Sequence, residues 1–320
     1  MKNIYKLGFP LSLFLFVLSP ITAQASCGGA FCSLSTDWDI QGVASKPGVR
    51  LDVRAEFIDQ DQLLSGTHKA APAGEVGEHD EVRTINRNLL ATLDWNINAD
   101  WGLTVKVPFV SRAHQHIFNK DDSFGGVDPQ NESWNFAGIG DVQVLARYRF
   151  YKDMHSNAGV RFGLKLPTGS IHKKNSEEEA ERTLQLGSGS VDSLLGAYYN
   201  HHNGNIGWFA QGMWQQTISE RDNFKLGTKL SANVGVSYYA TPDLSFMLQL
   251  NALHKAKDSG ANAEPNDSGG STISVSPGVS YRVMGNTQLY GFLQNPLYQR
   301  LNGAQLAADW SIAFGINTAF

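Results

Sequence analysis

The chain has 320 residues and a formal net charge of −4, and its length suits one large domain or two of average size. Charged residues make up only 18% of it and 32 residues are glycine, a composition that favours many short strands over helices. No run of about 20 apolar residues follows the N-terminal region, which excludes a transmembrane helix. The mildly acidic balance, without a basic cluster, argues against a nucleic-acid partner.

The first 25 residues have the three parts of a secretory signal. Lys2 and Lys6 supply the positive start, residues 11–18 supply the apolar stretch, and Ala23-Gln24-Ala25 supplies a small-residue cleavage site. We therefore predict that residues 1–25 are a signal peptide and that the rest of the chain is exported.

Two cysteines, Cys27 and Cys32, follow the predicted cleavage site closely. Because an exported protein meets an oxidising compartment, we predict that they form a disulfide and close a small loop. A haem attachment would need Cys-x-x-Cys-His, and a metal site would need ligands from elsewhere in the chain. The alternative is a lipid anchor on Cys27, but Gln24 stands where a lipoprotein signal has an aliphatic residue.

From residue 48 onward, segments of about ten residues alternate apolar and polar side chains, as strands of a transmembrane barrel do. A soluble sandwich would also alternate, but it would turn its charges outward, whereas a barrel turns them into a wet lumen. The alternation predicts twelve strands, at residues 48–59, 88–98, 101–112, 141–151, 158–166, 191–200, 206–217, 229–239, 244–253, 272–283, 288–294 and 308–320.

The connections between these predicted strands alternate in length. Short ones lie at 98–100, 152–157, 201–205, 240–243 and 284–287, and long polar ones lie at 60–87, 113–140, 167–190, 218–228, 254–271 and 295–307. Bacterial barrels have short periplasmic turns and long extracellular loops, an alternation that a soluble sandwich has no reason to follow. We predict an all-β fold, a transmembrane antiparallel up-and-down β-barrel of about 12 strands in the bacterial outer membrane. Residues 48–320 would form the barrel and residues 26–47 a periplasmic N-terminal segment.

Glycine-rich turns and strand edges recur from residue 138 onward. They include Gly138-Ile139-Gly140-Asp141 leading into 142–150, Leu164-Lys165-Leu166-Pro167-Thr168-Gly169, Leu186-Gly187-Ser188-Gly189-Ser190, and Pro296-Leu297-Tyr298-Gln299 with Asn302-Gly303. In these segments the chain resembles an outer-membrane transporter family named for a MetA-like protein of phenol-degradation pathways. The resemblance covers about residues 85–320, without the segment that holds both cysteines. It implies a barrel that takes part in small-molecule passage, without fixing the solute or any functional residue.

Side-chain parity predicts which charged residues line the lumen. Inward cations outnumber inward anions: Arg50, Arg54, Lys106, Arg147, Arg149, Arg161, Lys165, Lys229 and Arg282 against Asp52, Glu56, Asp141, Asp192 and Asp309. Charges on a narrow pore wall bias which ions enter, so a channel that prefers anionic or polar solutes is predicted. The alternative is that these charges pair across neighbouring strands and only fill the lumen.

Large side chains share the predicted lumen with these charges, namely Tyr198, Tyr239, Met247, Tyr290 and Phe292. They would either contact an aromatic solute or fill space.

Histidines in the long connections are candidates for a metal site. His79 lies among acidic residues, and His114 and His116 are two apart after the strand predicted at 101–112. Imidazole and carboxylate groups together bind transition metals, but the spacing matches no specific motif and a solvated loop is the alternative. We expect no cofactor from the sequence.

Three classes of function remain to be compared. The main hypothesis is a channel for small, aromatic or anionic solutes, in which residues 26–47 act as a plug or gate. The alternative is a barrel-anchored binding module whose extracellular loops capture metal or a partner protein. An enzyme is not expected, because no predicted strand carries an outward histidine and no G-x-S-x-G motif occurs.

The expected partners follow from the predicted outer-membrane location. They are membrane lipid, lipopolysaccharide near the acidic loops, a small-molecule solute, and the barrel-assembly machinery, which reads a terminal aromatic residue such as Phe320. No nucleic acid is expected, and the oligomeric state stays open.

Overall fold

The computed structural model describes residues 34–38, 41, 47–72, 74–77, 79–176 and 178–320. Among these residues, no helix is long and apolar enough to cross a membrane. The strands are β1 (Gly48–Gly66), β2 (His68–Lys69), β3 (His79–Asn96), β4 (Trp101–Asp121), β5 (Val127–Ile139), β6 (Val142–Lys152), β7 (Ser156–Leu166), β8 (Asp192–Asn203), β9 (Ile206–Thr217), β10 (Lys229–Tyr239), β11 (Leu244–Lys255), β12 (Gly270–Met284) and β13 (Thr287–Ala319).

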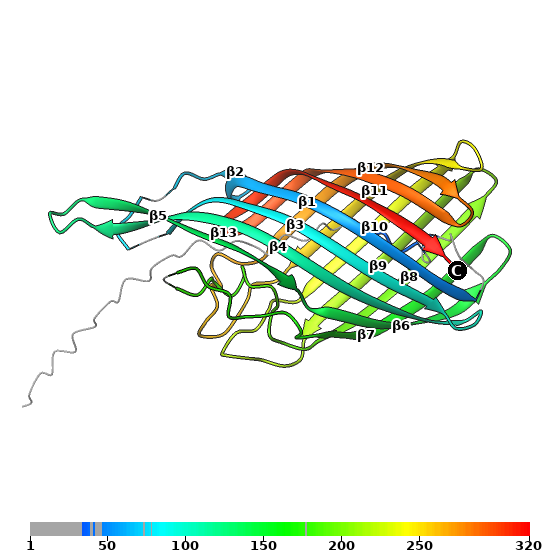
Figure 1. Cartoon of the computed structure of the whole chain (residues 1–320), viewed down its shortest axis with the longest axis horizontal. Coiled ribbons are helices and arrows are strands. Elements are labelled where there is room, and N and C mark those ends of the chain that lie inside the picture. The colour runs from blue at the N-terminus through cyan, green and yellow to red at the C-terminus, as the bar shows by residue number, and fades with distance from the viewer. Residues whose placement is uncertain (1–33, 39–40, 42–46, 73, 78, 177) are drawn as a thin grey trace, which may run out of the picture.

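Eleven of these strands form a closed antiparallel barrel, and β2 and β5 lie beside it (Figure 1). Neighbours in the wall follow chain order from β1 and β3 to β13, which pairs back with β1. β2 pairs with the end of β1, and β5 pairs with the outer part of β4. The predicted all-β up-and-down barrel is confirmed.

The long strand β13 crosses the wall twice. Its residues 287–301 pair with β12 and its residues 301–319 pair with β1, in both cases antiparallel. The two parts lie side by side, because Thr287 Oγ1 is 2.9 Å from Thr318 Oγ1 and Gln299 Nε2 donates to the Ala308 carbonyl. Gly303 lies near the reversal with a φ of +59°, a left-handed conformation that favours glycine. The wall therefore has about twelve crossings, and the loop predicted at 295–307 is wrong.

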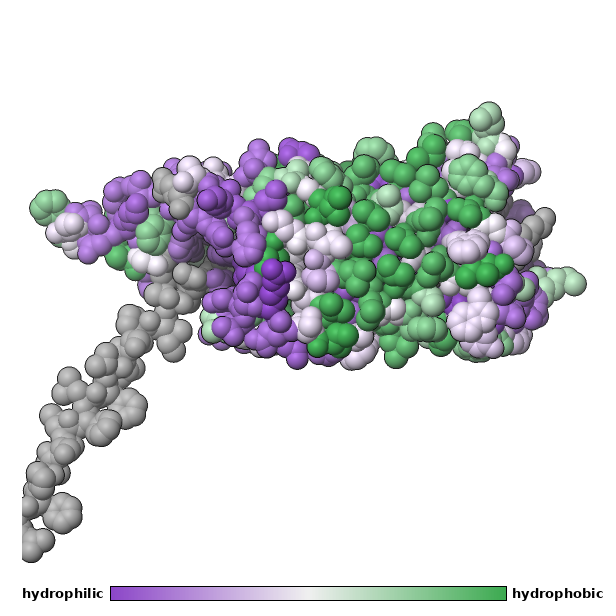
Figure 2. Space-filling view, turned by 60° about the horizontal axis from the view of Figure 1, so that its bottom comes forward, coloured by the Kyte–Doolittle hydropathy of each residue, from purple (hydrophilic) through white to green (hydrophobic). Residues whose placement is uncertain are grey.

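The side chains of the wall are arranged opposite to those of a soluble protein. In β11, Phe246, Leu248 and Leu250 are about half exposed on the outside, while Gln249 and Asn251 are buried inside. The same alternation places an apolar belt across the barrel, with hydrophilic residues beyond it at the end that carries β5 (Figure 2). Such a belt is the surface that a barrel presents to lipid.

Several strands continue past the apolar belt at the end opposite the C-terminus (Figure 1). The β1–β3 ladder reaches Gln60↔Thr84, and the β3–β4 ladder reaches His79↔Phe118. Most of the connections predicted at 60–87 and 113–140 are therefore strand, which corrects the sequence prediction. The backbone ladder therefore continues beyond the part of the wall in which apolar and polar side chains alternate regularly. The connections at 167–190 and 218–228 are mainly loop, as predicted.

The signal peptide predicted for residues 1–25 and the disulfide predicted between Cys27 and Cys32 lie outside the described residues.

We expect Leu248→Arg to destabilise the refolded barrel by about 2–4 kcal/mol, since it places a charge in the lipid-facing belt. Val127→Arg is the matched control, because Val127 is similarly exposed but lies on β5, off the barrel. Urea unfolding in lipid vesicles measures both variants. Equal destabilisation of the two would contradict the proposed position of the belt.

Candidate functional site

Residues 34–38, which we call the inner segment, lie inside the barrel. Within the inner segment, Asp37 forms ion pairs with the barrel wall: its carboxylate oxygens lie 2.6 Å from Lys106 Nζ and 2.8 Å from Arg161 Nη1. Lys106 is on β4 and Arg161 is on β7, so one carboxylate joins the inner segment to two strands of the wall. The three side chains are at most one quarter exposed, so these ion pairs fix the position of the inner segment better than pairs on the surface would.

Trp38 anchors the end of the inner segment in an apolar cluster. Its side chain is 2% exposed, and its Nε1 donates to Asp52 Oδ2 over 2.9 Å. The centroid of its ring lies 4.8 Å from the centroid of the Tyr290 ring. Leu34, Met247, Tyr290, Phe292 and Ala313 complete this cluster with Trp38. The predicted inward residues Met247, Tyr290 and Phe292 therefore contact the chain's own N-terminal region.

Polar contacts hold the middle of the inner segment from other strands. Arg54 Nη1 donates to Thr36 Oγ1 over 2.7 Å, Gln211 Nε2 donates to Ser35 Oγ over 2.6 Å, and Gln249 Nε2 donates to the Ser35 carbonyl over 3.0 Å. These donors come from β1, β9 and β11. The inner segment is thus bonded around much of the lumen wall.

The loop between β7 and β8 packs into the other end of the lumen. Leu184 and Leu186 of this loop are buried against Val110, Trp134 and Phe136. At its base the backbones of Gly169 and Gly187 approach so closely that a Cβ on Gly169 would lie 2.7 Å from the Gly187 Cα. Two of the glycine-rich segments noted in the sequence, ending at Gly169 and containing Gly187, therefore make the loop's entry and exit fit together.

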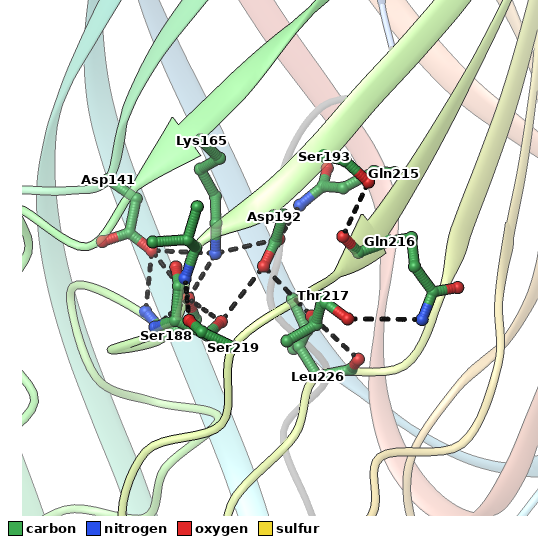
Figure 3. A network of polar contacts seen from close by, with 12 residues as sticks. Asp141, Lys165, Ser188, Asp192, Ser193, Gln215, Gln216, Thr217, Ser219 and Leu226 are labelled. Carbon is green, nitrogen blue, oxygen red and sulfur yellow. Dashed lines mark hydrogen bonds and ion pairs between the residues drawn. The ribbon is translucent and has the colours of Figure 1, made fainter.

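A polar network fixes this loop to the wall (Figure 3). Lys165 Nζ lies 3.1 Å from Asp141 Oδ2 and 3.0 Å from Asp192 Oδ2, and the Ser188 amide donates to Asp141 over 2.8 Å. Thr217 Oγ1 donates to Asp192 Oδ1 over 3.0 Å. The network joins β7, β8, β9 and Asp141, the residue before β6, at the level where the loop enters the lumen.

A cavity of about 350 Å³ lies between the inner segment and the β7–β8 loop. Cationic side chains predominate in its lining over the carboxylates of Asp37 and Asp141: Arg54, Lys106, Arg112, Arg161, Lys165, Arg182, Lys229 and Lys255. Apolar side chains complete the lining, among them Leu145, Leu194, Met213, Phe224 and Leu226. The cavity can therefore hold a molecule that has both an anionic group and an apolar body.

The sequence-predicted lumen residues do not all lie in one place. Five of the predicted cations line the cavity, together with Asp141: Arg54, Lys106, Arg161, Lys165 and Lys229. Asp52, Glu56, Arg50, Arg147 and Arg149 are buried elsewhere in the barrel, and Glu56 pairs with Arg54 at 2.7 Å. Arg50 donates to Asn317, Arg147 to Asn96, and Arg149 to the Ala99 carbonyl. The contacts of these residues therefore match the alternative prediction, in which polar side chains bond to one another and fill the lumen.

One prediction of an inward side chain is wrong. Asp309 is exposed next to Trp310, because register shifts between β1 and β13 turn two successive side chains outward, as a bulge does. Parity is preserved only along a regular ladder, so it fails at this place. Arg282 keeps the parity of the buried Ser280, but it lies near the end of β12, where it is exposed beside Asp243.

Two further lining residues, Arg182 and Asp37, could not be identified from a sequence pattern. Arg182 lies in the β7–β8 loop, where no periodicity indicates a direction, and Asp37 lies in the segment before the first strand. Arg112 ends the strand predicted at 101–112 and shares the parity of Lys106, so that pattern could have identified it.

The histidine candidates come together. His79, His114 and His116 lie at the outer ends of β3 and β4, beside Glu81 and Glu132.

The β7–β8 loop and the loop between β11 and β12 bring acidic groups close to one another. Burial, and then the charges of Asp267 and Asp258, raise the pKa of Glu264 to about 8. Burial and the neighbouring charge of Glu264 also hold the pKa of Glu181 well above its usual value. The folded loops therefore keep protons that the unfolded chain loses above about pH 4.5.

This shift predicts that loop packing weakens as the pH rises from about 4.5 to about 8, where Glu264 ionises. Amide-exchange protection in residues 167–190, corrected for the intrinsic pH dependence of exchange, measures the effect. Protection should fall over this range in the native sequence and stay more constant in Glu264→Gln. A fall of equal size in both proteins would contradict the assignment.

Comparison with known proteins adds three findings. The model of the family described as "Putative MetA-pathway of phenol degradation" matches residues 83–296. An outer membrane channel from Pseudomonas putida F1 has a similar structure, with a TM-score of 0.60 and 16% sequence identity over 87% of this chain and 97% of that chain. A comparison with curated proteins finds no match.

Two further solved structures are similar at a lower level. The transport unit of the autotransporter AIDA-I from Escherichia coli has a TM-score of 0.49 and 11% identity, over 90% of this chain and 93% of that chain. The Ralstonia pickettii toluene transporter TbuX has a TM-score of 0.47 and 9% identity, over 87% and 91%. With its TM-score of 0.60, the Pseudomonas putida channel shows the same barrel fold, independently of the family match.

Proposed function

The chain belongs to the family described as "Putative MetA-pathway of phenol degradation", and we propose that it is an outer-membrane channel for small anionic solutes with an apolar body. The family match confirms the resemblance expected from the sequence motifs. An outer-membrane location agrees with the lipid-facing belt and with the shared fold of the Pseudomonas putida channel. The proposed role is transport without catalysis.

The cavity is the observation that carries this proposal. A channel for neutral apolar solutes would need few charges in its interior, whereas eight cationic side chains line this cavity. Six of these cations form ion pairs, and the carboxylates that they contact are those of Asp37, Glu56, Asp141, Asp192, Asp222 and Asp258. Eight cations against these six carboxylates leave two positive charges in excess. The lining therefore keeps an excess of positive charge that attracts anions.

The apolar part of the lining indicates the rest of the solute. Leu145 and Leu194 from the wall face the same cavity as Phe224 and Leu226 from the loop between β9 and β10. Its volume of about 350 Å³ falls at the lower end of typical small-molecule pockets. An aromatic or short aliphatic carboxylate combines these features.

The inner segment is proposed to act as the plug of this channel. It lines one side of the cavity, and its bonds to β1, β4, β7, β9 and β11 hold it across the lumen. A solute can pass only if these bonds open or if the remaining space suffices. We propose that displacement of the inner segment opens the channel.

The charge of the cavity predicts its ion selectivity. Lys229→Glu should move the reversal potential in a potassium chloride gradient towards cation selectivity, because it reverses a charge on the cavity wall. Arg282→Glu makes the same change in charge at the exposed end of β12, away from the cavity, and should have little effect. Planar-bilayer recording of refolded protein measures both. A similar shift in the two variants would exclude the cavity as the selectivity site.

The plug predicts a second result. Asp37→Ala removes the ion pairs to Lys106 and Arg161, which should cost the closed position about 2 kcal/mol. That loss corresponds to roughly a 30-fold shift in population towards the displaced segment, and it should appear as larger or more frequent conductance steps. Asp243→Ala, at an exposed turn, is the control. Unchanged conductance in Asp37→Ala, and in a chain lacking residues 26–45, would contradict the plug.

A further inference from the structure

Three histidines and two glutamates meet where the wall continues beyond the apolar belt. His79 and Glu81 are on β3, His114 and His116 are on β4, and Glu132 is on β5. We call these five residues the histidine cluster. The strand register places His116 directly opposite Glu81 on one side and Glu132 on the other. The ladder itself therefore brings side chains from three strands to one point.

The ligand atoms of the histidine cluster are close enough to share an ion. His116 Nε2 lies 3.0 Å from His79 Nδ1 and 2.8 Å from Glu132 Oε2, and His114 Nε2 lies 3.6 Å from Glu81 Oε2. In each of two groups, His79 with His116 and Glu132 and Glu81 with His114 and His116, the ligand atoms all lie within 4.8 Å of one another. A tetrahedral ion with bonds of about 2.1 Å separates its ligand atoms by about 3.4 Å, so small rotations would suffice.

The surroundings favour the ligand form of these side chains. The side chains of His114 and Glu81 are fully buried, and that of His116 is 2% exposed. Burial favours the neutral imidazole, which is the form that binds metal. Thr84 Oγ1 lies 2.8 Å from His114 Nδ1, and the Trp134 ring packs at 4.6 Å from the His116 ring. Such outer contacts fix the orientation of metal-binding rings.

The simpler account is a hydrogen-bonded network without metal, since two of the distances are those of hydrogen bonds. That network places two carboxyl groups in a poorly solvated site, where a divalent cation would interact favourably with both. Nitrogen and oxygen ligands of this kind suit Zn²⁺ and related ions.

We propose that the histidine cluster binds one divalent transition-metal ion, with His79, His116 and Glu132 as ligands and with Glu81 and His114 packed beside them. The ion would connect β3, β4 and the projecting strand β5 outside the membrane (Figure 1). None of these five residues lines the cavity, so the proposed metal site does not depend on the channel function.

The test is zinc binding by the refolded, tag-free chain from residue 26 onward in a Cys27→Ser/Cys32→Ser background, which removes thiol ligands. Competition with a chromophoric chelator gives affinity and stoichiometry, and the Co²⁺ visible spectrum reports tetrahedral coordination. We expect one ion per chain and a loss of affinity of at least about 100-fold in His116→Ala. Glu132→Gln, which keeps the side-chain shape, should also bind more weakly.

The matched control is His172→Ala, because His172 is an exposed imidazole 3.5 Å from Glu179. It should bind zinc as the parent chain does. Shifts in gel mobility on heating show that each variant is folded before it is titrated. No binding by the folded parent chain, or equal affinity in His116→Ala, Glu132→Gln and His172→Ala, would overturn the proposal.

Discussion

Every backbone amide and carbonyl within a lipid bilayer must find a partner in the protein, and for this chain the pairing of β13 with β1 completes that requirement. The ladder from Arg50↔Ala319 to Gly66↔Leu301 closes the wall. Because side chains alternate along each closed strand, the apolar side chains face lipid and the polar ones face the lumen. A narrow lumen then receives charges such as Arg54 and Arg161 that need partners when they are removed from water.

The interior of the barrel is organised around those charges. The inner segment brings Asp37 to Lys106 and Arg161, while the β7–β8 loop brings Ser188 to Asp141 beside Lys165. The inner segment and the β7–β8 loop each provide partners for charged side chains of the wall. Each also packs an apolar side chain in the lumen, Trp38 in the inner segment and Leu184 in the loop. The cavity is the space that they leave between them, and for that reason it combines positive charge with apolar lining.

The strands of the barrel wall could be predicted from the sequence, but the register shifts and the segments outside regular strands could not. Regular alternation correctly located strands such as β10 and β11, because the boundary between lipid and lumen acts on every side chain there. Asp309 was assigned inward because parity cannot detect a register shift. The cavity depends on Asp37 and Arg182, which lie in irregular segments whose position is set by tertiary contacts alone. The histidine candidates were recognised by residue type, but only the long β3–β4–β5 ladder shows that they meet Glu132.

The central claim is that the cavity selects anions with an apolar body, and single-channel block measures this most directly. Benzoate and benzyl alcohol share an aromatic ring and differ in charge, so both should be added to the refolded channel in a planar bilayer. The account predicts that benzoate interrupts the ion current in a concentration-dependent manner at concentrations where benzyl alcohol has little effect. Equal block by the two compounds, or block by benzyl alcohol alone, would contradict it.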